Sequence, residues 1–174
     1  LERKDYKIIP ENTVTKKVEI EIKNKLRENS TFTFNFGSSI VDYNEGNPLP
    51  FFNYTFSTGD YIDSLKISGF VKDAYEIDSL DFVSIHLYPV DSVFNDSTIY
   101  NQKPFYVGNT LDSIYFELKN LAPGKYEFIA IKDQSKNYYF DQSFDKIGFF
   151  EKPIEIPKDS FFLPVLFKEI TNFQ

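Results

Sequence analysis

The chain has 174 residues, 41% of them hydrophobic, and its 19 Lys and Arg against 26 Asp and Glu give a net charge of −7. It contains no Cys and a single His, which excludes a disulfide framework, a cysteine-ligated metal site, a thiol nucleophile and a His-rich metal site. An acidic chain is a poor binder of nucleic acid, and no apolar run is long enough to form a helix across a bilayer.

Aromatic residues dominate the apolar part of the composition. The chain holds 20 Phe and 12 Tyr but no Met or Trp, and aromatic side chains suit the pleated, half-buried surface of a β-sheet. Because no Met occurs, we expect this chain to be part of a longer or processed product, with any export signal already removed. The composition predicts a soluble, β-rich globular protein and names no reaction.

Apolar and polar residues alternate with a period of two along most of the chain, which predicts β-strands. The alternating segments are residues 18–22, 32–36, 52–56, 65–69, 83–87, 114–118, 126–131 and 161–167. Most aromatic residues lie in phase with apolar neighbours and are expected in the core. The only helix predicted is about one turn around residues 141–146. A turn-rich stretch at residues 58–64 marks the expected domain boundary.

The first third of the chain carries a series of spaced motifs. They are Leu26–Phe32, Phe36–Asp42, Gly46–Leu49 and Phe56–Gly59. In this order they resemble the C-terminal half of an S-layer-type bacterial Ig-like domain, over residues 14–60. The opening strands of that family have no counterpart here, so the resemblance implies an incomplete sandwich or one completed by another segment.

A second set of motifs lies further along the chain, at Ile67–Val71 and Phe116–Tyr126. Pro123 fixes φ and Gly124 is expected to take a positive φ, which gives a tight turn with Leu118, Leu121 and Tyr126 in the core around it. This segment resembles carboxypeptidase-regulatory-like, or transthyretin-like, sandwiches over residues 65–157.

The two resemblances together predict an all-β fold of two tandem β-sandwiches. The first is the C-terminal portion of a bacterial Ig-like sandwich over residues 1–62, and the second is a transthyretin-like sandwich over residues 63–174. The tandem arrangement is similar to the exported Ig-like lipoproteins of Bacteroidota. This implies a non-catalytic module at the cell surface or in the periplasm, associated with the outer membrane.

Asp-Ser followed by an apolar residue or Thr is more frequent than the one pair or so that this composition predicts by chance. The serines of these tripeptides are Ser64, Ser79, Ser92, Ser97 and Ser113. The pattern resembles the O-glycosylation acceptor of exported Bacteroidota proteins, so we expect a glycan on at least one of them. The alternative is that Asp-Ser is ordinary turn chemistry.

His86 alternates out of phase with Val83, Ile85 and Leu87, so it should lie on the opposite face of its strand, beside Ser84 and Tyr88. A catalytic His needs an orienting acid and a nucleophile, and no Gly-x-Ser-x-Gly segment supplies one. We therefore predict an ordinary strand residue, no catalytic residues and no enzyme.

Oxygen-bearing side chains recur in one loop at relative positions 1, 3, 5 and 9. They are Asp133, Ser135, Asn137 and Asp141. Calcium binds such oxygens, although Tyr138 stands where an EF-hand needs Gly. The loop is a candidate calcium site, the only cofactor considered, and an Asx-rich hairpin is the alternative.

Three consecutive aromatic residues, Tyr138, Tyr139 and Phe140, follow in the same loop and must expose at least one ring. Exposed rings more often mark a protein contact than a ligand site. The leading hypothesis is therefore a non-enzymatic scaffold or protein-binding module that docks an outer-membrane protein or complex. The alternative is a carbohydrate-binding module in which these loop aromatics hold glycan.

Overall fold

The protein is an all-β chain that divides into two compact units. In the structure, a computed structural model, these units are Leu1–Asp63 and Ser64–Gln174. The structure describes residues 5–10, 14–49, 52–75, 82–91, 94–110 and 113–167. The division falls one residue after the boundary expected from the sequence. Each unit is described by itself below.

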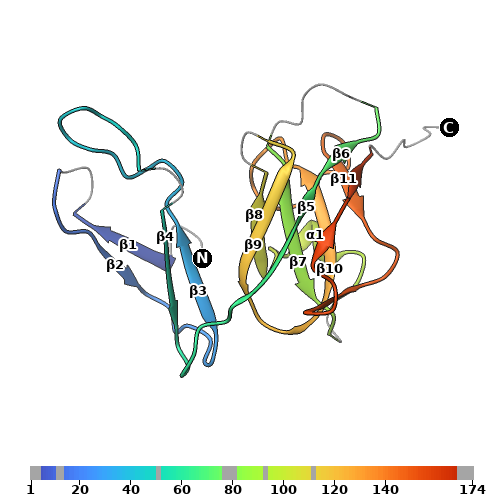
Figure 1. The fold of residues 1–174 in the computed structure, drawn as a ribbon, viewed down its shortest axis with the longest axis horizontal. Coiled ribbons are helices and arrows are strands. Elements are labelled where there is room, and N and C mark those ends of the chain that lie inside the picture. Colours follow the sequence, from blue (N-terminus) through green and yellow to red (C-terminus); the bar gives the residue numbers. More distant parts are fainter. Residues whose placement is uncertain are drawn as a thin grey trace. The chain divides into compact units, whose positions relative to one another are not determined.

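The N-terminal unit consists, in its described part, of two antiparallel hairpins (Figure 1). The first pairs β1 (Tyr6–Ile9) with β2 (Glu19–Ile22), and the second pairs β3 (Thr31–Asn35) with β4 (Asn53–Ser57). The register of the second hairpin places Phe opposite Phe or Tyr and Thr opposite Thr. Because neighbouring residues of a strand point to opposite faces, this hairpin has one aromatic and one polar face.

No side chain in the described part of this unit is fully buried, although its alternating aromatics were expected in a core. Phe32 and Phe34 are half-buried against the Phe56 ring, with centroid distances of 5.7 and 5.9 Å. Phe52 and Tyr54 remain 41% and 57% exposed. The rings of this hairpin are thus covered mainly by one another.

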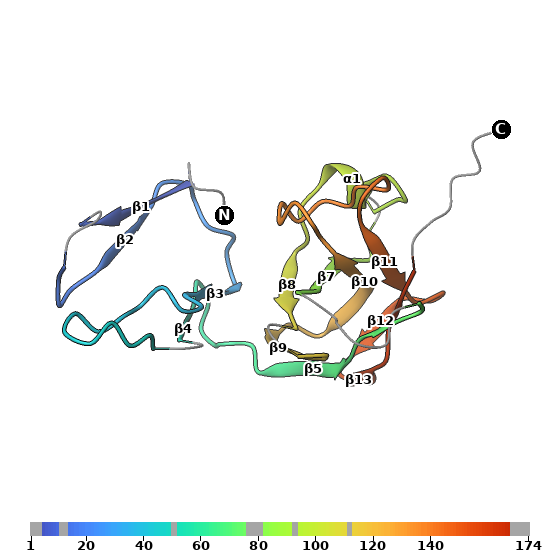
Figure 2. The same ribbon diagram turned by 90° about the horizontal axis from the view of Figure 1, so that it is seen from above.

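The C-terminal unit is a sandwich of two main sheets. Its strands are β5 (Leu65–Phe70), β6 (Lys72–Asp73), β7 (Ser84–Pro89), β8 (Tyr106–Asn109), β9 (Tyr115–Leu121), β10 (Gly124–Lys132), β11 (Lys146–Phe149), β12 (Ile154–Ile156), β13 (Phe161–Phe162) and β14 (Val165–Leu166). One sheet has the order β11-β10-β7-β8 with β12 also on β10, the other has the order β13-β5-β9, and β14 pairs with β6. Figure 2 shows the two sheets as separate layers.

Every segment in which alternation predicted a strand overlaps one to within a residue at its ends or lies inside one, except that residues 161–167 split into two short strands around Leu163 and Pro164. Both of these strands pair in parallel, β13 with β5 and β14 with β6. The specific Ig or transthyretin type of either unit stays a prediction.

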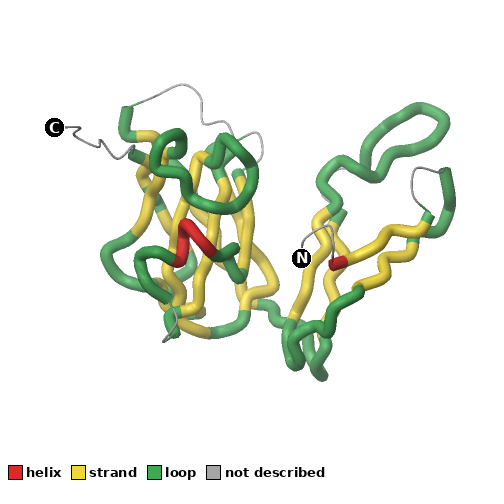
Figure 3. Tube along the Cα trace, turned by 180° about the vertical axis from the view of Figure 1, so that it is seen from behind, coloured by secondary structure: helices red, strands yellow, loops and turns green. Residues whose placement is uncertain are grey.

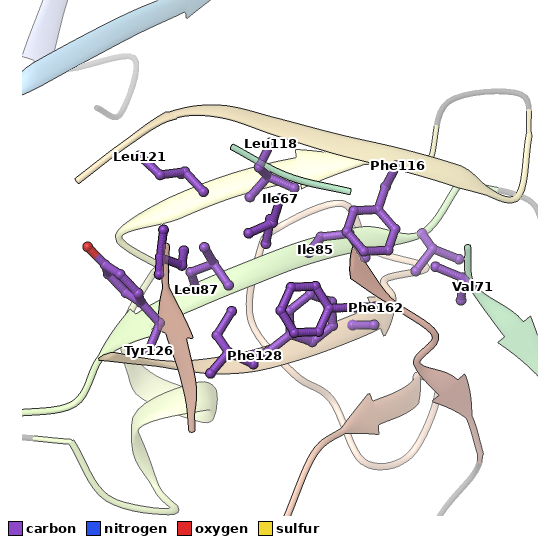
Figure 4. Packing of buried hydrophobic residues seen from close by; sticks show 14 of the residues in the cluster. Ile67, Val71, Ile85, Leu87, Phe116, Leu118, Leu121, Tyr126, Phe128 and Phe162 are labelled. Carbon is purple, nitrogen blue, oxygen red and sulfur yellow. The ribbon is translucent and has the colours of Figure 1, made fainter. Parts of the chain in front are cut away.

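The main core lies between the two sheets (Figure 4). Phe116 from β9, Phe128 from β10 and Phe162 from β13 meet there, with Phe128 5.7 Å from Phe116 and 5.4 Å from Phe162 between ring centroids. Leu118 and Leu121 are also buried, as expected for residues on either side of the Pro123-Gly124 segment.

A smaller apolar cluster covers the other face of the larger sheet. It comprises Tyr88, Ile129, Ile131, Phe140 and Ile147. The short helix α1 (Thr98–Asn101) and the loop between β10 and β11 form the covering layer (Figures 2 and 3). As predicted from alternation, Phe128 and Ala130 face the main core whereas Ile129 and Ile131 face this layer.

The turn predicted around residues 141–146 is present as a single helical turn, in which the Asp145 N–H donates to the Asp141 carbonyl before the chain enters β11. The helix of the described residues is α1, which no periodicity predicted.

The positive φ of the Pro-Gly segment lies at Asn120 (59°) and not at Gly124, which is the first residue of β10. Space around Gly124 is tight, because a Cβ there would lie 3.2 Å from the Tyr126 ring. The Tyr126 hydroxyl donates to the Ala122 carbonyl at 3.0 Å and closes this corner. In the described residues, no helix is long and apolar enough to cross a membrane.

Candidate functional site

His86 lies on β7 beside Ser84 and Tyr88, as its phase predicted, and the structure buries all three under the covering layer. Its Nε2 atom is 2.8 Å from Ser84 Oγ, and its Nδ1 atom is 3.5 Å from the Tyr88 hydroxyl. The Tyr138 ring lies 6.1 Å from the imidazole between centroids. The sequence placed the first two neighbours, but the contact with Tyr138 depends on how the loop folds back.

Burial governs the protonation of this cluster. Desolvation lowers the pKa of His86 to about 4, and the Asp133 carboxylate opposes this decrease only in part. Desolvation also raises the pKa of Tyr88, and the nearby Tyr139 adds to the increase. Ser84 and His86 are both 0% exposed, so a substrate cannot reach Ser84 Oγ in this conformation. The Ser–His pair acts here as a satisfied polar contact inside the fold.

Two buried aspartates, Asp133 and Asp145, organise the loop between β10 and β11. Asp133 accepts hydrogen bonds from the Ser135 hydroxyl at 3.0 Å and from the Tyr138 N–H at 2.8 Å. Asp145 accepts from the N–H groups of Gln134 and Asp141 at 3.0 and 2.9 Å. Desolvation nevertheless raises the pKa of the Asp145 carboxyl. The two carboxylates accept hydrogen bonds from backbone N–H groups of the loop and thereby fix its conformation.

The four candidate calcium ligands therefore have other partners. Asn137 Oδ1 accepts from the Tyr139 N–H at 2.8 Å, and Asp141 Oδ1 accepts from the Ser143 N–H at 2.9 Å. Together with the contacts of Asp133 and Ser135, these are the bonds of an Asx-rich hairpin. Among the described residues, no three His, Cys, Asp or Glu side chains are grouped as a metal site would require.

Calcium at this loop stays a prediction with a direct test. An ion that binds only the folded chain stabilises it by about 2.7 kcal/mol at a free concentration 100 times its Kd. Saturating calcium should then raise the melting temperature and a chelator should reverse the increase, with magnesium as the control ion. An unchanged melting temperature in differential scanning calorimetry leaves the hairpin as the complete explanation of the loop.

The three loop aromatics predicted to bind a partner are not equivalent. Tyr138 is 37% exposed with a φ of 66°, Tyr139 is half-buried, and Phe140 is 5% exposed. Phe140 packs into the smaller cluster with its ring 5.4 Å from the Tyr100 ring. Phe140 is therefore mainly a core residue, whereas Tyr138 is the most exposed of the three and Tyr139 is partly accessible.

A shallow, open groove with a volume of about 500 Å³ lies between α1 and this loop. It is lined by Tyr100, Asn137, Tyr139, Phe140, Asp141 and Gln142. The sequence pattern did not point to Tyr100 or Gln142 as groove residues. For Tyr100 the reason is that no pattern predicted the helix that carries it next to the loop. Tyr138 is not among the lining residues.

Three of the five predicted glycosylation sites lie in the described residues, and all three are exposed. Ser64 immediately precedes β5, Ser97 precedes α1, and Ser113 precedes β9. Each is thus at the start of an element, where Asp-Ser also serves as turn chemistry. Ser79 and Ser92 lie outside the described residues.

Two clusters of aromatic rings on sheet surfaces include exposed members, namely Phe52 and Tyr54 in the first and Phe70, Tyr115 and Phe161 in the second. The first, named here the β3–β4 aromatic face, comprises Phe32, Phe34, Phe36, Phe52, Tyr54 and Phe56. The second lies on β5, β9 and β13, where Phe70 contacts Tyr115 and Phe161 at centroid distances of 5.4 and 5.9 Å. The period-2 pattern predicted which of these side chains share a face, and it could not tell how far each ring is exposed.

Comparisons with known proteins do not add a function to this geometry. No protein-family model, no curated protein and no solved structure matches the chain. The site therefore has to be interpreted from its own chemistry.

Proposed function

We propose that the protein is a non-enzymatic structural or protein-binding module of an exported cell-envelope protein. It belongs, in this proposal, to an outer-membrane lipoprotein or to a subunit of an outer-membrane complex. The observation that carries the protein-binding part is the β3–β4 aromatic face, with its six rings on one side of a two-stranded hairpin. The export, lipoprotein and glycosylation parts rest on the resemblances of the sequence.

An isolated hairpin is at best marginally stable in water, and a sheet needs a covered apolar face. The opposite face of this hairpin is polar throughout, and Thr33 and Thr55 hydrogen-bond across it at 3.0 Å. The two faces therefore differ in polarity. Contact with a protein would remove apolar surface from water only at the aromatic face, and this is the face where binding is favourable. Aromatic side chains are also the residues that most often dominate binding energy at interfaces.

The charge of the segment around the β3–β4 hairpin indicates which charge the partner's surface should carry. From residue 28 to residue 65 the chain has no Lys or Arg, whereas Asp42, Glu45, Asp60 and Asp63 lie in this stretch. A partner that covers the aromatic face with apolar side chains and presents Lys or Arg at its rim is the complementary surface. We expect it to supply further β-strands, because β3 and β4 are paired only with each other among the described residues.

The test places a charge in the aromatic face. Tyr54→Lys puts an ammonium group among the rings, and we expect at least a tenfold loss of co-purification with an outer-membrane assembly in the native organism. Thr33→Lys, on the polar face of the same hairpin, is the matched control and should bind normally. Soluble glycans should not compete.

Equal binding by both variants, or loss of binding on addition of soluble glycan, contradicts the proposal. Circular dichroism of each variant controls for a change in fold.

A further inference from the structure

We propose that the groove between α1 and the β10–β11 loop is a binding site for a neutral pyranoside. The site lies within the C-terminal unit and does not depend on the β3–β4 aromatic face, so it can be right where the proposed protein partner is wrong. It differs from the site expected at the sequence level, because Tyr100, Asn137 and Asp141 join Tyr139 there and Tyr138 does not.

The groove combines rings with hydrogen-bonding side chains. Tyr100 is 42% exposed and Tyr139 is half-buried, and together they provide ring surface on which the apolar face of a sugar can pack. Asn137, Asp141 and Gln142 line the same space with amide and carboxylate groups. A pyranose needs both, since it has an apolar face of C–H groups and a rim of hydroxyl groups.

The loop holds the side chains of Asn137 and Asp141 in place through one atom of each. The other polar atom of each side chain remains able to bind a ligand. Asn137 Oδ1 and Asp141 Oδ1 are held by the N–H groups of Tyr139 and Ser143. In the described part of the chain, Asn137 Nδ2 donates to no group and Asp141 Oδ2 accepts from none. One donor and one charged acceptor are thus fixed at the groove before any ligand arrives, which lowers the entropy cost of binding.

Charge separates a neutral sugar from other ligands of similar shape. Asp133, Asp141 and Asp145 outnumber Lys136 in the loop and Lys103 beside it, so an anionic sugar or phosphate meets a net negative charge. A quaternary ammonium ligand would suit rings next to a carboxylate, but Lys103 Nζ already lies 5.7 Å from the centre of the Tyr139 ring and repels a second cation. A purely apolar ligand would displace water from the Asn137 amide and the Asp141 carboxylate and offer neither group a hydrogen bond. A neutral polyol with one apolar face meets none of these penalties.

The substitution that isolates the donor is Asn137→Asp. It keeps the Oδ1 acceptor for the Tyr139 N–H but replaces the amide donor by a carboxylate oxygen. Asn35→Asp is the matched control, because Asn35 Oδ1 accepts from the Gly37 N–H at the same 2.8 Å and lies in the other unit. Tyr139→Ala removes the ring, and Tyr75→Ala, at a residue 68% exposed outside the groove, is its control.

The probes are the methyl glycosides of glucose, mannose and galactose, together with N-acetylglucosamine and choline. Because the groove is open, we expect Kd values in the millimolar range, which ¹H–¹⁵N correlation spectra of the whole chain can follow. At least one sugar should shift the amide signals of Tyr100 and of residues 137–142. Asn137→Asp and Tyr139→Ala should each weaken binding by about tenfold or more, whereas both controls should bind as the wild type does. The absence of shifts with every sugar, shifts that survive Asn137→Asp, or binding of choline alone would each overturn the proposal.

Discussion

Replacing Phe128 by Ala should destabilise the C-terminal unit by about 3–5 kcal/mol, the usual cost of removing a buried aromatic ring. Phe128 is 1% exposed and lies between Phe116 and Phe162 at the centre of the main core. The loss of stability has two causes. The variant has no ring to transfer from water into the core on folding, and the neighbouring rings are left around a cavity. Urea denaturation followed by the amide signals of β7 and β10 measures this unit alone.

The control is Phe161→Ala, which removes the same ring from a side chain 55% exposed on β13. It should change the free energy of unfolding by about 1 kcal/mol or less. Phe128→Leu provides a milder change in case the alanine variant does not fold. Similar losses for Phe128→Ala and Phe161→Ala would contradict the arrangement of the core.

The stability of the C-terminal unit should fall as the pH decreases from about 6.5 to about 4, because of His86. Burial lowers the pKa of His86 in the folded chain to about 4 from its usual value of 6.5. Between these values the unfolded chain binds a proton that the folded chain does not, so falling pH favours unfolding. A pKa difference of this size contributes about 3 kcal/mol to the free energy of unfolding. This contribution is lost fully once the pH is below the pKa of His86 in the folded chain.

Other groups act in the opposite direction and must be separated. Desolvation raises the pKa values of Asp145 and Glu127, so these carboxyls take up protons more readily in the folded chain and stabilise it as the pH falls. Asp133 and the Tyr88 hydroxyl also face the His86 environment. The relevant quantity is therefore the difference between the wild type and His86→Gln, whose amide can still hydrogen-bond to Ser84.

The direct measurement is an NMR titration of the imidazole, which is unambiguous because the chain has one His. We expect a pKa near 4 and a steeper loss of stability in the wild type than in His86→Gln. A titration near 6.5, or equal pH dependence of the two proteins, would show that His86 is solvated and that the covering layer is open.

The face of the sheet on which each strand residue lies could be predicted from the sequence, because successive side chains of a β-strand point to opposite faces. A period of two places Phe128 and Ala130 on one face of β10 and Ile129 and Ile131 on the other, and the structure has them in two different clusters. It likewise placed His86 beside Ser84. These predictions need no knowledge of what packs against the strand.

The candidate site was less predictable because its parts come from different segments. Tyr139, Asn137 and Asp141 were recognised in one loop, but Tyr100 lies on a four-residue helix too short to show a period. Gly124 shows the same limit, since it has no positive φ and the tight contact at this position is with the Tyr126 ring, which its neighbours in sequence do not reveal.

By itself, the sequence determined the all-β class, the positions of most strands and the side chains that share each face, because these depend on residues one or two apart. Only the tertiary structure decided which faces are covered. It buries His86 under α1 and the β10–β11 loop, packs Phe140 of that loop into the smaller cluster, and leaves Phe52 and Tyr54 exposed on the β3–β4 aromatic face. Burial depends on contacts between segments distant in the chain, and alternation has the same appearance on a covered and an uncovered sheet.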